Sequence, residues 1–100
     1  ACAEALDDAR YWVDQNTYSH DEIAVRFHHA LVFIHPFPNG NGRWSRLMAD
    51  LLIVSLGGKR FSWGGAQTLR SADETRRAYI AALRAADNHD FEPLIAFARS

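Results

Sequence analysis

The sequence predicts an all-α fold, on three observations. Apolar residues recur at spacings of three and four, the period of a helix face, in residues 21–34, and a largely apolar helix is indicated in residues 44–56. Helix-ending residues follow these segments, at Pro36 and at the Gly57-Gly58 pair. Residues 3–14 hold no hairpin signal and are expected to be helical as well. With 100 residues, 48% of them apolar, the chain is expected to form one domain with its own core.

The first two predicted helices carry apolar faces and lead to the first chemical group. Residues 3–14 supply apolar contacts from Leu6, Ala9, Tyr11, Trp12 and Val13. The apolar face of residues 21–34 consists of Ile23, Phe27, Ala30, Leu31 and Ile34. Because the residue before a proline is pushed out of the α region, Pro36 ends this helix and leaves His35 at its C-terminal end.

Two further helices are expected after residue 56. Ser71 and Glu74 have the spacing of a capping box, which opens a helix that runs to about Ala86. Residues 91–99 predict a short closing helix. Between them and the earlier helices, residues 59–65 form a connector that allows a brief extended segment.

The run HPFPNGNGRWSR, residues 35–46, is the candidate functional site. Gly40 and Gly42 let the backbone take positive φ values and approach a ligand closely. The turn leads into the next helix, expected to begin at residue 44, where unpaired N–H groups and the helix dipole bind anions. Arg43 and Arg46 stand at i and i+3, and their guanidinium groups match phosphate oxygens. A bound polyanion explains why two cations lie where the dipole disfavours them.

His35 is the candidate proton acceptor of this run. The negative end of the preceding helix favours the protonated imidazole, which makes the neutral ring a better base. Taken alone, a histidine at a helix end is more often structural; the glycines and arginines that follow favour the chemical interpretation. Phe37 and Trp44 are expected to be scaffold aromatics that fix the loop.

The same run resembles the motif of the Fic domain family, H-x-F-x-[D/E]-G-N-G-R-x-x-R, at seven positions in order and spacing. More narrowly, HPFPNGNGR followed by RLMADLL and GGKRFSWG is similar to the subgroup called mobile mystery protein B. The resemblance implies a Fic-type helical bundle with its catalytic loop between two central helices. Residues 1–100 are expected to be the core of such a domain. Its N-terminal part, with the β-hairpin flap that docks the target, is expected to lie outside this segment.

The resemblance implies a protein adenylyltransferase, which moves AMP from ATP to a Ser, Thr or Tyr hydroxyl of a target protein. His35 would be the general base, and Phe37 would anchor the loop in the core. The residues implied to bind the nucleotide and its phosphates are Asn39, Gly40, Asn41, Gly42, Arg43 and Arg46. Mg²⁺ would bridge the phosphates and neutralise the developing charge.

Asn39 departs from the family motif, which has Asp or Glu at this metal-contacting position. A neutral amide oxygen is a weaker ligand for Mg²⁺ than a carboxylate. Either the metal is held mostly by phosphate and water, or the activity is weak or altered. Two alternatives therefore stay open: transfer of phosphate or another nucleotide group by the same site, and a nucleotide-binding module or toxin–antitoxin partner domain with little catalysis.

Many members of the family are inhibited by a helix with the pattern [S/T]-x-x-x-E-[G/N], whose glutamate pairs with the second arginine of the motif. None of the four glutamates of this chain has Ser or Thr four positions before it. An inhibitory helix is therefore expected from the missing N-terminal part or from a separate antitoxin-like protein. Arg46 would then be unblocked in this segment, which is expected to bind ATP without activation.

Composition narrows the class of protein further. A net charge of −1 gives no general attraction to nucleic acid or to an anionic membrane. The longest apolar run, residues 51–56, is too short to span a bilayer, and no signal peptide is visible. The single cysteine excludes an internal disulfide, so a cytoplasmic location is expected. His28 and His29 are adjacent, point to different helix faces, and are not expected to form a zinc site with His35.

Overall fold

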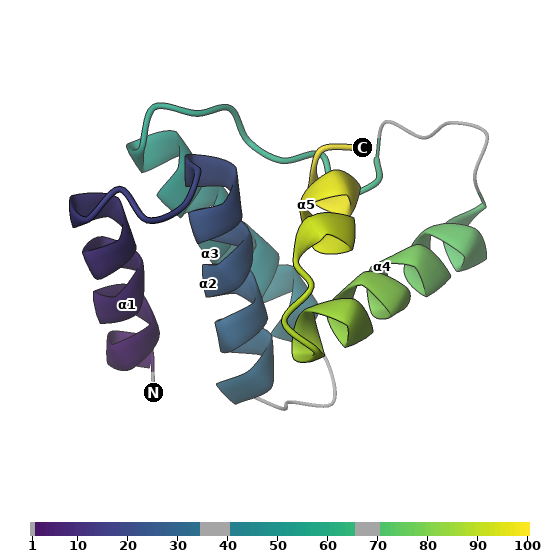
Figure 1. Ribbon diagram of the computed structural model, residues 1–100. Helices are drawn as coiled ribbons and strands as arrows, with labels where there is room; N and C mark the ends of the chain where they lie inside the picture. The colour runs from purple at the N-terminus through teal and green to yellow at the C-terminus, as the bar shows by residue number, and fades with distance from the viewer. Residues whose placement is uncertain (1, 35–40, 66–70) are drawn as a thin grey trace. The chain divides into compact units, whose positions relative to one another are not determined.

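The computed structural model describes residues 2–34, 41–65 and 71–100, and this part of the chain is built of helices without strands (Figure 1). The helices are α1 (Cys2–Asp14), α2 (His20–Ile34), α3 (Asn41–Ser55), α4 (Ala72–Asp87) and α5 (Glu92–Ala98). The prediction of an all-α fold is confirmed. The helices belong to two compact units, Ala1–Arg60 and Phe61–Ser100.

The core of the first unit lies where α1, α2 and α3 meet. Ala5 and Ala9 of α1 pack with Ile23, Phe27 and Leu31 of α2, all at most 4% exposed. Partly buried side chains complete this cluster from α1, α2, α3 and the turns beside them: Trp12, Val13, Tyr18, Ala30, Met48, Leu52 and Leu56. Burying one large aliphatic side chain stabilises a fold by roughly 1.5–3 kcal/mol, so this cluster holds the three helices together.

The buried face of α1 differs in part from the expected one. Leu6 and Tyr11 are 44% and 62% exposed, whereas Ala5 is buried. Positions 5, 9, 12 and 13 fall on one side of a helix with 3.6 residues per turn, whereas position 6 falls at the edge of that side and position 11 falls nearly opposite it. The expectation that Leu6 and Tyr11 supply core contacts is therefore wrong, because helical geometry places a smaller residue at the contact.

Arg26 fastens the turn between α1 and α2. Its Nε donates to a carboxylate oxygen of Glu22 at 2.9 Å, one helical turn earlier. The guanidinium carbon lies 3.9 Å from the ring centroid of Tyr18 and 5.8 Å from that of Trp12. The two rings meet edge to face at 5.6 Å. The attraction between the Arg26 cation and these aromatic rings adds to the apolar packing at this corner.

The end of α3 matches the glycine stop in the sequence. Gly57 has a φ of +90°, and its N–H donates to the Val54 carbonyl at 3.0 Å. The N–H of Gly58 donates to the Ile53 carbonyl at 2.9 Å. These are the two hydrogen bonds of a Schellman cap, which requires a left-handed residue that glycine adopts without strain.

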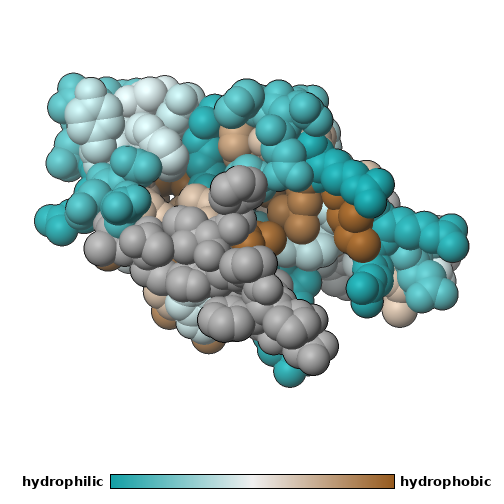
Figure 2. All heavy atoms as spheres, turned by 90° about the horizontal axis from the view of Figure 1, so that it is seen from below, coloured by the Kyte–Doolittle hydropathy of each residue, from teal (hydrophilic) through white to brown (hydrophobic). Residues whose placement is uncertain are grey.

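One face of α3 is apolar but exposed. Trp44, Leu47, Leu51 and Val54 recur at spacings of three and four and are 40–58% exposed. Trp44 lies on this outer face and so is not part of the core, and its expected role in fixing the loop stays a prediction. In the view of Figure 2, hydrophilic residues surround smaller apolar patches.

The second unit is built from α4, α5 and the segment before them. Ser71 caps α4, with its hydroxyl accepting from the Glu74 N–H at 3.1 Å, as the capping box predicts. Residues 59–65 contain no strand, and Trp63 has a φ of +50° in a turn. The N–H groups of Ser62 and Trp63 both donate to the Ala98 carbonyl at 2.9 Å, which ties this segment to the end of α5.

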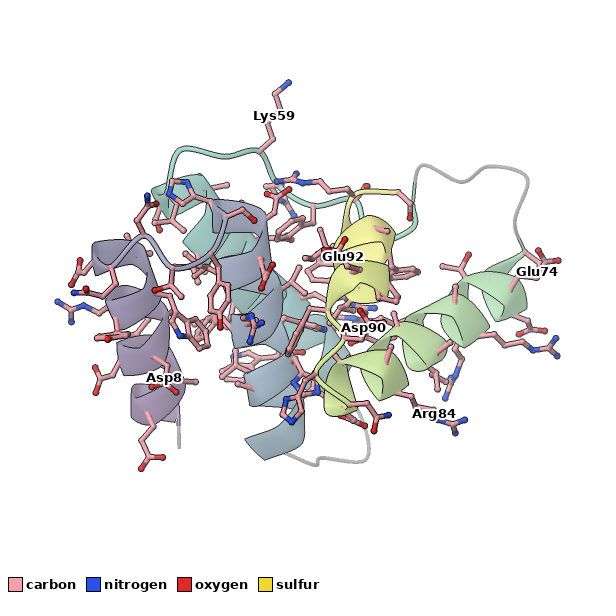
Figure 3. All side chains as sticks on the ribbon, viewed as in Figure 1. Asp8, Lys59, Glu74, Arg84, Asp90 and Glu92 are labelled. Atoms are coloured by element: carbon pink, nitrogen blue, oxygen red, sulfur yellow. The ribbon has the colours of Figure 1, made fainter. Side chains whose placement is uncertain are left out.

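Side chains at the surface of both units point away from the ribbon. Figure 3 shows this for Asp8 of α1, Lys59, and Glu74 and Arg84 of α4, all exposed. None of the described helices has both the length and the apolar composition needed to cross a lipid bilayer.

Candidate functional site

The candidate site spans the junction between α2 and α3. His35, Phe37, Asn39 and Gly40 lie outside the described residues, and the described part of the run begins at Asn41. The C-terminal end of α2 and the N-terminal end of α3 lie at the same end of the first unit (Figure 1). The end of α2 and the start of α3 are therefore the described elements that flank the candidate site.

Helix α3 begins at Asn41, three residues before the expected start at Trp44. The Asn-Gly-Asn-Gly run reads as a turn in the sequence, but the first N–H groups of a helix have no partner within it, so a glycine costs little there. The expected start at residue 44 is therefore wrong, and Asn41, Gly42 and Arg43 are the first residues of the helix. Their N–H groups belong to the first helical turn, which is the anion-binding end of a helix.

The charges in the first turn of α3 differ from those of every other described helix. The first turns of α1, α2, α4 and α5 each contain an acidic residue, which suits the positive end of the helix dipole. The first turn of α3 contains none and has Arg43 instead. Arg46 follows at i+3, half-buried, while Arg43 is exposed. This end of α3 thus concentrates positive charge that an anionic ligand would neutralise.

His28 of α2 is the unexpected member of this region. Its side chain is completely buried. The pKa of His28 is lowered from 6.5 to about 4. Burial is the largest cause, a hydrogen bond with the backbone of Ser45 opposes it, and the charges of Arg46 and His29 add to the lowering. The ring is therefore neutral at pH 7, between α2 and the first turns of α3.

One feature of the sequence points to His28, namely its spacing from the motif. It precedes His35 by seven residues, which is close to two turns of a helix. The side chain of Ser45, its partner residue, is also completely buried, as are Ala49 and Ile53 at the following turns of α3. Small residues at positions 45 and 49 let helices approach closely.

The described residues 2–34, 41–65 and 71–100 contain no group of three or more His, Cys, Asp or Glu that could hold a metal ion. The proposed metal contact, Asn39, lies outside them. The second unit has a hollow of about 420 Å³ between α4 and α5. Its lining consists of Ala78, Ala81, Ala82, Pro93, Ala96, Phe97 and Ser100. It contains no titratable side chain, so it offers no group for acid–base chemistry.

Comparison with known proteins connects the site to a family. The sequence profile described as the Fic/DOC family matches residues 2–53. The proteins named protein adenylyltransferase fic-1 from Caenorhabditis elegans and Caenorhabditis briggsae are 33% identical over 97 residues, which is 94% of this chain and 18% of theirs. Protein adenylyltransferase Fic from Nematostella vectensis is 34% identical over 76 residues, which is 76% of this chain and 16% of its own. The chain thus spans less than a fifth of the length of these relatives. No solved structure matches it.

Proposed function

Because this chain belongs to the Fic/DOC family, we propose that it is the core of a protein adenylyltransferase, which transfers AMP from ATP to a hydroxyl side chain of a target protein. The observation that carries the proposal is the first turn of α3, which lacks an acidic residue and contains Arg43 and Asn41 of the motif. A helix end of this kind attracts a polyphosphate.

The proposed reaction is an in-line displacement at the α-phosphorus of ATP. His35, which follows α2 directly, takes the proton of a Ser, Thr or Tyr hydroxyl of the target. The hydroxyl oxygen forms a bond to the α-phosphorus, and the bond from that phosphorus to the bridging oxygen of the β-phosphate breaks. Pyrophosphate leaves with the bonding electrons, and the target retains AMP as a phosphodiester.

The remaining motif residues hold the nucleotide. Gly40, Asn41 and Gly42 bring backbone N–H groups close to the phosphates, and Arg43 and Arg46 bind the phosphate chain. Phe37 anchors the loop in the core.

Mg²⁺ enters this scheme as part of the substrate, bound to ATP, where it neutralises phosphate charge. Asn39 offers it only a neutral amide oxygen, so phosphate oxygens and water would provide most of its ligands. The absence of a carboxylate at Asn39 also favours a second candidate function, a nucleotide-binding domain with weak catalysis. A glutamate that pairs with Arg46 and inhibits nucleotide binding would come from an N-terminal part outside this segment or from a separate antitoxin-like protein.

Mass spectrometry tests the proposal directly. The purified protein is incubated with Mg²⁺·ATP and a cell extract, and modified proteins are identified. A mass gain of one AMP supports the proposal, a gain of phosphate indicates the other transfer, and nucleotide binding without modification indicates the binding domain.

The His35→Ala variant tests the role of the base. We expect it to lose AMP transfer while ATP affinity changes less than about twofold, because the ring acts on the attacking hydroxyl and not on the phosphates. His20→Ala is the control, since His20 is an exposed histidine at the other end of α2. Undiminished transfer by the His35→Ala protein would remove this residue from the mechanism.

A further inference from the structure

A buried polar contact joins α2 to the first turns of α3. His28 and Ser45 are both completely buried, and the ring of His28 is hydrogen-bonded to the backbone of Ser45. Because this bond favours the protonated ring, the ring N–H is the donor and the Ser45 carbonyl is the acceptor. The contact lies within the first unit, between the two helices whose ends meet at the candidate site.

Ser45 lies between the two arginines of the motif in sequence. Fixing its carbonyl therefore fixes the direction in which Arg43 and Arg46 leave the helix. The charge of Arg46 also acts on the His28 ring. On α2, His28 lies within two turns of Ile34, the residue before His35.

The hydrogen bond favours one orientation of the two helices, which apolar packing alone does not. Burial of apolar surface is non-directional, whereas a hydrogen bond weakens steeply when its angle changes. The Ser45 carbonyl is also the regular acceptor for the Ala49 N–H within the helix. It therefore does not need His28 for its own hydrogen bonding, and what His28 contributes is the rotation and height of α3 relative to α2.

We propose that His28 is a positioning residue for the phosphate-binding turn: by holding the Ser45 carbonyl, it sets Arg43 and Arg46 against the end of α2 that precedes His35. The proposal rests on the proposed function only for its nucleotide-binding readout. His28 itself contacts no phosphate and transfers no proton in this scheme.

Two substitutions of His28 separate positioning from simple space filling. His28→Gln keeps an N–H donor near the place of Nε2, and His28→Leu keeps a similar volume without a donor. By isothermal titration with Mg²⁺·ATP, we expect His28→Leu to weaken affinity at least tenfold and His28→Gln less than threefold. His20→Leu, the same change at the exposed start of α2, is expected to leave affinity unchanged. Equal affinities for the wild-type and His28→Leu proteins would overturn the proposal.

Amide hydrogen exchange gives a readout that needs no nucleotide. In the His28→Leu protein, the N–H groups of residues 45–48 should exchange at least tenfold faster, while those of α1 keep their rates; His28→Gln should restore slow exchange. Unchanged exchange in the His28→Leu protein contradicts the positioning role. If the wild-type protein binds no ATP, the proposed function fails, and the exchange result still decides the role of His28.

A shorter amide serves where His28→Leu does not fold. The Asn side chain of His28→Asn offers the same chemical group as Gln but is one methylene shorter, so it does not reach the Ser45 carbonyl from the place of Nε2. Faster exchange at residues 45–48 in the Asn protein than in the Gln protein supports the proposal. Equal exchange in the two proteins contradicts it.

Discussion

At the scale of single residues, His28 makes the free energy of unfolding depend on pH. The pKa of its ring is lowered from 6.5 to about 4 by burial. Above pH 6.5 the ring is neutral in both the folded and the unfolded chain. As the pH falls from 6.5 towards 4, the unfolded chain binds a proton at His28 that the folded protein does not bind, so the free energy of unfolding decreases.

This pH dependence is testable with the His28→Gln protein. Each pKa unit corresponds to about 1.4 kcal/mol, so the wild-type protein should lose roughly 3 kcal/mol through this group when the pH falls well below 6.5. The Gln protein lacks the titrating ring and should lose correspondingly less. Urea unfolding at pH 7 and pH 4.5 measures both losses, and identical losses would show that His28 takes up its proton as easily in the folded protein.

The residues of the site differ in whether their neighbours in space are also their neighbours in the sequence. The motif from His35 to Arg46 is contiguous, so its glycines and arginines point to phosphate binding without a structure. The partner of His28 is seventeen positions away on another helix, and its burial depends on how two helices pack. A single sequence does not show how these two helices pack, so it does not predict the hydrogen bond between them.

At the scale of elements, the N-cap of α4 offers a local test. The Ser71 hydroxyl accepts from the Glu74 N–H at 3.1 Å. Ser71→Ala should lower the free energy of unfolding by about 1 kcal/mol, because a helix N–H loses its partner. Ser71→Asn is the control, since Asn is an equally good cap and should keep nearly full stability. Urea denaturation measures both, and an equal loss in the two variants would contradict a capping role.

The sequence predicts a helix end correctly where the hydrogen bonds of the cap join residues close together in the chain. The stop of α3 at Gly57 and the start of α4 after Ser71 depend on hydrogen bonds within a few residues. The start of α3 at Asn41 was placed three residues late, because Asn and Gly favour turns and first helical turns alike. The face of α1 was misjudged at Leu6 and Tyr11 because the segment has more apolar residues than one contact face needs.

At the scale of the whole molecule, ATP binding should appear as resistance to unfolding. A ligand at about 100 times its dissociation constant stabilises the folded state by about 2.7 kcal/mol. Arg46→Ala should weaken nucleotide binding by roughly 1–3 kcal/mol, the scale of a charge-assisted hydrogen bond, and so reduce this stabilisation. Thermal unfolding at increasing Mg²⁺·ATP concentrations measures the effect.

The control for this measurement is Arg84→Ala. Arg84 is exposed in the last turn of α4, in the second unit, and points away from the ribbon (Figure 3). Its removal also takes away one positive charge but should leave the ATP-dependent rise in melting temperature intact. A rise in the Arg46→Ala protein equal to that of the wild type would show that this guanidinium does not bind the nucleotide.

Arg43 is exposed and Arg46 is half-buried. In the proposed scheme this difference would give Arg43 more influence on the association rate of an anion and Arg46 more influence on its dissociation rate. Mobile ions screen exposed charges over about 8 Å at physiological ionic strength, and they screen partly buried charges much less. In the proposed scheme the exposed Arg43 would therefore attract a polyphosphate from a distance, chiefly in dilute salt, and its contribution to the association rate would fade as salt is added. The half-buried Arg46 would then slow the release of the polyphosphate, and added salt would change that rate less.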